Sequence, residues 1–140
     1  MTDKEAITIK TLVNAPVEKV WEVWTDPKHI VKWAFASDDW EAPYADNDVK
    51  VGGRFKTTMA AKDKSASFDF TGIYTAVTEN KLIEYDIDDG RHVKAEFKEV
   101  PDGVNITVIF DPENENPIEM QRSGWQTILD NFKKYVESTS

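Results

Sequence analysis

The stretch 117–136, near the C-terminal end of the chain, most constrains what this sequence can fold into. Its apolar side chains fall on one stripe of an α-helix, formed by Ile118, Trp125, Leu129, Phe132 and Val136. The opposite side of the helix is polar and carries Glu119, Arg122, Asp130 and Lys133. A stripe that contains an indole and a phenyl ring needs a curved apolar surface to cover it, and the rest of the chain must supply that surface.

Alternating apolar and polar residues predict strands ahead of this helix. We expect these strands at residues 5–13, 40–44, 54–61, 65–78, 81–88, 91–100 and 104–110. Gly72 lies within the longest of them and indicates a bulge or bend of the kind that curls a sheet. Two short helices are expected after the first strand, at residues 17–24 and 27–33, with Asn14 and Asp26 as their caps.

The turns between the predicted strands are short, so neighbouring strands must run antiparallel. The order of elements predicts an α+β fold in which a curved antiparallel sheet of about six to seven strands wraps around the long C-terminal helix. The two short helices that follow the first strand close one end of this arrangement. A chain of 140 residues fits a single domain, which we expect to span residues 1–140.

Composition excludes several functional classes. The net charge is −9, with 26 acidic and 17 basic residues, and such a surface repels nucleic acid and anionic lipids. The absence of cysteine removes disulfides and thiolate chemistry and suits a reducing compartment. No apolar run follows the charged start of the chain and none reaches membrane-spanning length, so we expect a cytoplasmic protein without membrane insertion.

The chain is rich in aromatic side chains, with five Trp and seven Phe. Two interpretations remain open at this point. The rings either make a dense core or line a cavity that holds an apolar ligand.

Motifs for catalysis or metal binding are not evident in the sequence. His29 and His92 are the two histidines, and their spacing does not place them on one metal ion. The acidic cluster at residues 38–48 lacks the ladder of a calcium loop, and we interpret it as a solvated rim. Gly52 and Gly53 do not belong to a phosphate-binding motif, so they indicate a turn. We therefore expect no catalytic residue, no metal and no cofactor.

Five motifs, in this order along the chain, resemble one family. They are Ile7-x-Ile9-x-x-x-Val13-x-Ala15-Pro16-x-x-x-Val20-Trp21, Asp26-Pro27-x-x-Ile30-x-x-Trp33, Gly52-Gly53-x-Phe55, Phe70-x-Gly72-x-Tyr74, and Gly124-Trp125-x-x-x-Leu129-x-x-Phe132. Together they resemble the SRPBCC (START, Bet v 1-like) superfamily, and within it the branch named for the activator of the heat-shock protein 90 ATPase.

This resemblance implies a helix-grip fold with a cavity between the sheet and the C-terminal helix. The residues expected to face that cavity are Trp33, Phe35, Trp40, Phe55, Met59, Phe68, Phe70, Tyr74, Tyr85, Phe97, Met120, Trp125 and Leu129. Plain core is the alternative for each of them. Phe35 and Trp40 lie in an irregular segment, which we interpret as the mouth of the cavity.

Three functions are compatible with the resemblance. The first is a carrier or sensor of a small hydrophobic molecule, lipid- or polyketide-like, with a stress-related role. The second is a domain that docks on a chaperone, as the name of the branch suggests. The third is a cyclase- or hydrolase-like enzyme, for which Arg122 and Tyr74 are the candidate polar groups.

Overall fold

The computed structural model describes residues 6–35, 37–113 and 116–138. Seven strands form the sheet: β1 (Ile7–Val13), β2 (Trp40–Asn47), β3 (Arg54–Ala61), β4 (Ser67–Thr78), β5 (Leu82–Ile87), β6 (His92–Val100) and β7 (Gly103–Phe110). The helices are α1 (Val17–Thr25), α2 (Pro27–Ile30) and α3 (Ile118–Ser138). Within the described residues, no helix is both long and apolar enough to cross a membrane.

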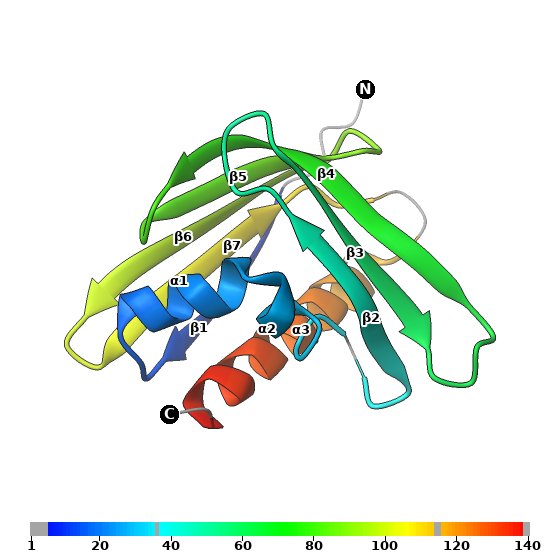
Figure 1. Ribbon diagram of the computed structural model, residues 1–140, viewed down its shortest axis with the longest axis horizontal. Coiled ribbons are helices and arrows are strands. Elements are labelled where there is room, and N and C mark those ends of the chain that lie inside the picture. Colours follow the sequence, from blue (N-terminus) through cyan, green and yellow to red (C-terminus); the bar gives the residue numbers. More distant parts are fainter. Residues whose placement is uncertain (1–5, 36, 114–115, 139–140) are drawn as a thin grey trace.

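The strands form one antiparallel sheet with the order β1-β7-β6-β5-β4-β3-β2. From β2 to β7 each strand pairs with the next one along the chain, and β1 pairs with β7. The strands β1 and β2 are therefore the two edges. The sheet arches over the three helices, which lie together on its concave side (Figure 1). The predicted α+β fold, a curved sheet around a long C-terminal helix, is confirmed.

Two details of the predicted helices are wrong. Asn14 does not cap α1, because the N-cap residue is Pro16 and no side chain caps this helix. Instead, the backbone N–H of Asn14 donates to the Glu137 carboxylate at 2.8 Å and so joins the first loop to the end of α3. Helix α2 ends at Ile30, three residues earlier than expected. The predicted cap of α2 is confirmed, since the Asp26 carboxylate accepts from the N–H of Lys28 at 2.9 Å.

Gly72 does not mark a bulge. It pairs regularly with Phe55 on one side and with Ile87 on the other, and the irregularity of β4 lies between Tyr74 and Ala76. A Cβ atom at position 72 would lie 2.7 Å from two ring carbons of Phe55 and 2.5 Å from the backbone oxygen of Asp86. Glycine is therefore required here because the backbone oxygen of Asp86 and the Phe55 ring both crowd this position of β4.

The C-terminal half of α3 packs on the two short helices. Leu129, Phe132 and Val136 are buried there, as the apolar stripe predicts. The Phe132 ring centroid lies 5.0 Å from that of Trp24 and 4.9 Å from that of Trp33, and both contacts are edge-on. Ile118, at the start of the stripe, is 37% exposed, so the first turn of α3 does not share this core.

The polar face of α3 is attached to the free edge of β1. Arg122 and Gln126 donate to the carbonyls of Thr8 and Lys10, each at 3.2 Å, and Lys133 donates to the carbonyl of Leu12 at 2.6 Å. The helix pattern alone suggested that Arg122 and Lys133 point away from the protein. Instead, both side chains bind the edge of β1. Their spacing along α3 matches alternate residues of β1, and the helix covers a strand edge that would otherwise be open to pairing.

We predict that Gly72→Ala destabilises the fold by about 1–3 kcal/mol, because the added methyl group overpacks the contact between Phe55 and β4. Gly124→Ala in α3 is the matched control, since a Cβ there meets nothing within 4 Å and alanine favours a helix by up to about 1 kcal/mol over glycine. Urea unfolding of both variants measures the difference. A Gly72→Ala variant as stable as the parent protein would contradict this account of the glycine.

Candidate functional site

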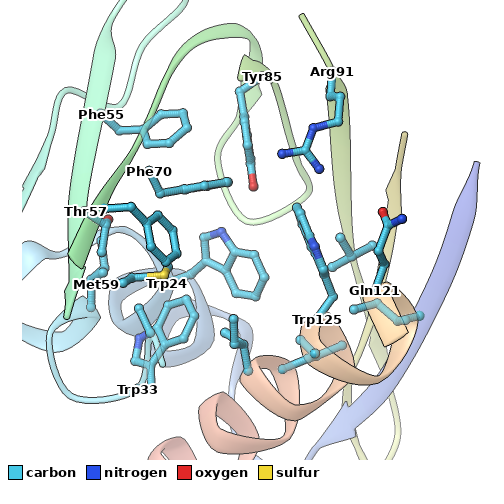
Figure 2. A pocket seen from close by; sticks show the side chains of 18 of the residues that line it. Trp24, Trp33, Phe55, Thr57, Met59, Phe70, Tyr85, Arg91, Gln121 and Trp125 are labelled. Atoms are coloured by element: carbon cyan, nitrogen blue, oxygen red, sulfur yellow. The ribbon is translucent and has the colours of Figure 1, made fainter. Parts of the chain in front are cut away.

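A cavity of about 400 Å³ lies between the concave face of the sheet and the N-terminal half of α3. Its size falls within the roughly 300–1,000 Å³ that is usual for small-molecule sites. Strands β3, β4 and β5 form one wall, and α3 forms the opposite wall. The short helices α1 and α2 contribute Trp24 and Ile30, respectively. Figure 2 shows the rings of these elements turned toward the same space.

Aromatic rings on the sheet hold one another in place along the wall. Phe55 lies edge-on to Tyr85 with 4.8 Å between centroids and contacts Phe70 at 5.6 Å. Across the cavity, the Trp125 ring stacks on Phe110 with centroids 3.9 Å apart and an interplanar angle of 9°. Trp125 also meets Phe70 edge-on at 6.2 Å, so the two walls touch at this point.

Most residues expected from the sequence to face the cavity do line it. They are Trp33, Phe55, Met59, Phe68, Phe70, Tyr74, Tyr85, Met120, Trp125 and Leu129. Phe68 and Met120 are 52% and 60% exposed, so these two side chains lie at the rim. The mouth is thus marked by the start of β4 and the first turn of α3.

Three of the expected residues lie elsewhere. Phe97 is buried behind Trp24 and does not line the cavity. The centroid of its ring lies 5.2 Å from the ring centroid of Trp24 and 5.5 Å from that of Trp21. The carbonyl of Phe35 accepts from Asn131 at 2.6 Å, and the half-buried side chain is not part of the cavity wall. Trp40 packs beside the rim residue Phe68, with ring centroids 5.9 Å apart, but does not line the cavity. Phe35 and Trp40 are therefore not among the lining residues, although Trp40 adjoins the rim.

Sequence reasoning missed most of the polar lining, including Asn47, Thr57, Arg91 and Gln121, as well as Gly124. Thr57 could have been found, because strand alternation places it on the same face as Phe55 and Met59. The others lie in a turn, at a strand end or on a helix, where an apolar pattern gives no signal for an inward polar group.

Two of these polar groups have structural partners. Gln121 is buried, accepts from the N–H of Glu113 at 2.8 Å and donates to the carbonyl of Asn116 at 2.8 Å, so it fixes the loop that leads into α3. Asn47 donates to the carbonyl of Thr25 at 2.7 Å and accepts from the Tyr74 hydroxyl. Burial raises the pKa of Tyr74, so this hydroxyl stays protonated at neutral pH.

Of the two candidate catalytic groups, Arg122 lies outside the cavity, since its guanidinium reaches the carbonyl of Thr8 at the edge of β1. Tyr74 lines the cavity, but its hydroxyl is held by Asn47. The two groups therefore do not form one reactive site.

Both histidines lie outside the cavity. His29 on α2 contacts the Tyr135 hydroxyl at 2.8 Å, and its other ring nitrogen lies 3.6 Å from the Glu22 carboxylate. Ligand atoms of Glu22, Asp26 and His29 lie within 4.8 Å of one another, the one such group in the described part of the chain. Helix capping by Asp26 and the bond of His29 to Tyr135 already account for this arrangement.

His92 on β6 contacts two carboxylates on the neighbouring strand β5. Its Nδ1 lies 2.6 Å from Asp86 and its Nε2 lies 2.9 Å from Glu84. These hydrogen bonds, the one to Asp86 first, raise the pKa of His92 above its ordinary value. The cluster is half-exposed, so it belongs to the surface of the protein.

The curved antiparallel sheet, the long C-terminal helix and the cavity between them define a helix-grip protein of the SRPBCC, START or Bet v 1-like, type. The sequence profile of the family described as Activator of Hsp90 ATPase homolog 1-like protein matches residues 14–137. The chain therefore belongs to this family, and the branch inferred from the motifs is confirmed.

Solved structures agree with this assignment. The chain is 44% identical to an AHSA1-like protein from Aeromonas hydrophila, with a TM-score of 0.90 over 95% of this chain and 92% of that one. It is 54% identical to a protein from Cytophaga hutchinsonii, with a TM-score of 0.83 over 95% and 92% of the two chains. A protein from Nitrosomonas europaea shares the fold, with 19% identity and a TM-score of 0.85 over 97% and 96% of the chains. No curated protein matches the chain.

We predict that His92→Gln lowers the melting temperature more at about pH 5.5 than at about pH 8.5. The pKa of His92 is raised in the folded state, above about 6.5 in the unfolded chain, so its stabilisation is complete below the unfolded value and is lost as the pH rises through the folded value. Lys94→Gln removes a positive charge from the same strand without removing an imidazole. Melting curves that show the same pH dependence for both variants would contradict the prediction.

Proposed function

We propose that this protein binds a small hydrophobic molecule in the cavity between the sheet and α3, and that it acts as a carrier or sensor. The walls are mainly aromatic and aliphatic, and the volume of about 400 Å³ suits a small organic ligand. The rim residues Phe68 and Met120 expose apolar side chains to solvent, which suits the entry of such a molecule.

Gly124 is the observation that carries this proposal. It lies within α3, lines the cavity, and a Cβ added to it would meet nothing within 4 Å. Glycine inside a helix costs about 1 kcal/mol relative to alanine, so a larger residue here would both favour the helix and fill the space. The chain therefore keeps a hollow at some cost in stability, as expected where the space itself serves the function.

The described contacts do not favour the enzyme hypothesis, because Arg122 lies outside the cavity and the Tyr74 hydroxyl is bonded to Asn47. We therefore propose binding without a reaction. The lack of cysteine suits the cytoplasm, where we place this function, and the family name suggests that the ligand is linked to a stress response.

Docking on a chaperone is a second candidate, favoured by the description of the family as homologues of an Hsp90 ATPase activator. The test is the ATP turnover of a purified Hsp90-type chaperone with and without this protein. A turnover that does not change at saturating concentrations of the protein, together with no detectable complex, removes this candidate and leaves ligand binding untouched.

We predict that Gly124→Leu abolishes binding of a neutral apolar dye such as N-phenylnaphthylamine, because the leucine side chain enters the cavity. Without the dye the variant should be at least as stable as the parent protein, since helix propensity and apolar burial both increase. Dye fluorescence measures binding, and urea unfolding measures stability.

Ser123→Leu is the matched control, since Ser123 is the exposed neighbour on the same turn of α3. It adds the same side chain outside the cavity, and dye binding should persist. Equal binding by both leucine variants would show that the dye does not enter the cavity. A parent protein that binds neither this dye nor other apolar molecules would overturn the proposed function.

A further inference from the structure

Arg91 brings a positive charge to one end of the cavity. It directly precedes β6, and it is the one basic residue among the described residues that line the cavity. Its Nε donates to the Asp89 carboxylate at 2.8 Å, which fixes the side chain, and the side chain as a whole is 21% exposed. Among the described residues the two terminal nitrogens have no partner, and Figure 2 shows them turned toward the space between Tyr85 and Trp125.

Tyr85 adds a second donor at the same end. Its ring is fixed by the edge-on contact with Phe55 at 4.8 Å, and its hydroxyl points into the cavity (Figure 2). In the described part of the chain this hydroxyl has no hydrogen-bond partner, and it is open to the space of the cavity rather than sealed in the core. Burial raises the pKa of Tyr85, and the nearby charge of Arg91 offsets this only in part, so the group remains an O–H donor at neutral pH.

Trp125 adds a third donor. Because one face of its ring is stacked on Phe110, the indole is held in a single orientation beside Arg91 and Tyr85 (Figure 2). Its N–H also has no partner among the residues that the structure describes, and it is likewise open to solvent rather than sealed in the core. Within the described ranges no buried side-chain nitrogen or oxygen lacks a partner, so these unpartnered donors are open to the space of the cavity. Three donors that converge on one space are available to an acceptor group of a ligand, which would replace their bonds to water.

Acidic groups of the lining do not occupy this position. Asp46 lies on β2, at the far edge of the sheet from β6. The Glu113 carboxylate accepts from Asn116 and makes no ion pair with Arg91 within the described residues. One guanidinium and two neutral donors suit one negative charge, and the net charge of −9 disfavours a more highly charged group.

We propose that the natural ligand is an amphipathic monocarboxylic acid, with its apolar body among the rings of β3, β4 and α3 and its carboxylate against Arg91, Tyr85 and Trp125. This inference rests on the proposed function, because it assumes that the cavity holds a ligand. A planar guanidinium can donate two parallel hydrogen bonds to a carboxylate, which makes this pairing stronger than one between neutral groups.

The test compares matched pairs that differ only in the head group, namely decanoate with decanol and naphthylacetate with naphthylethanol. Displacement of N-phenylnaphthylamine measures each affinity. We expect the parent protein to bind each acid about 10- to 100-fold more tightly than its alcohol, the range for a hydrogen bond to a charged group. Arg91→Gln should remove this preference and leave the affinity for the alcohols unchanged.

Two further variants make the result specific. Tyr85→Phe keeps the ring and removes one neutral donor, so it should weaken acid binding by about 2- to 10-fold without affecting the alcohols. Arg54→Gln is the matched control, since Arg54 also pairs with an aspartate, Asp88, but lies on the exposed surface. It should keep the full preference for acids.

The outcomes separate the two proposals. Binding of the alcohols with no preference for the acids overturns the anionic ligand and leaves the hydrophobic cavity as the site. A preference for acids that survives both Arg91→Gln and Tyr85→Phe shows that the carboxylate lies elsewhere and also overturns this inference. Failure of every acid and every alcohol to bind overturns the proposed function itself.

Discussion

The attachment of α3 to the edge of β1 determines the rest of the structure. Arg122, Gln126 and Lys133 donate to alternate carbonyls of that strand, so the helix is held along one edge of the sheet rather than across its centre. Only its C-terminal half then reaches the rings of Trp24 and Trp33. In the N-terminal half, Trp125 stacks on Phe110 and meets the edge of Phe70 on β4. The cavity is the space that remains around these contacts, between α3 and strands β3, β4 and β5.

The aromatic residues of the wall keep this space open. A half-barrel of strands curves enough to face a helix, but without large fixed side chains the helix could collapse onto it. Phe55 is locked above Gly72, and Trp125 is locked on Phe110, so neither ring can rotate freely to fill the hollow. The aromatic richness of the sequence therefore serves the core and the cavity together, and the two interpretations drawn from composition were not exclusive.

Periodicity and the order of elements predicted the fold, and the resemblance to the family then implied much of the apolar wall. Phe68, Phe70 and Tyr74 alternate along β4, and a strand buried on one face must place them on the same side. Phe35 and Trp40 could not be placed this way, because the segment that holds them has no repeating pattern. Arg91 was missed for a related reason, since the direction of a side chain in a turn depends on contacts such as that with Asp89, which only the structure shows.

The position of one positive charge inside a protein with a net charge of −9 has a consequence for selectivity. The surface repels polyanions at a distance, and screening by salt confines that repulsion to about 8–10 Å. A small acid with a single charge would meet little of this repulsion, and in the proposed site it would face a guanidinium whose interaction with it is stronger than in water because the apolar walls lower the local dielectric. The negative surface would then disfavour the approach of nucleotides and phospholipids. The positive charge in the cavity would favour binding of acids over neutral molecules of the same shape.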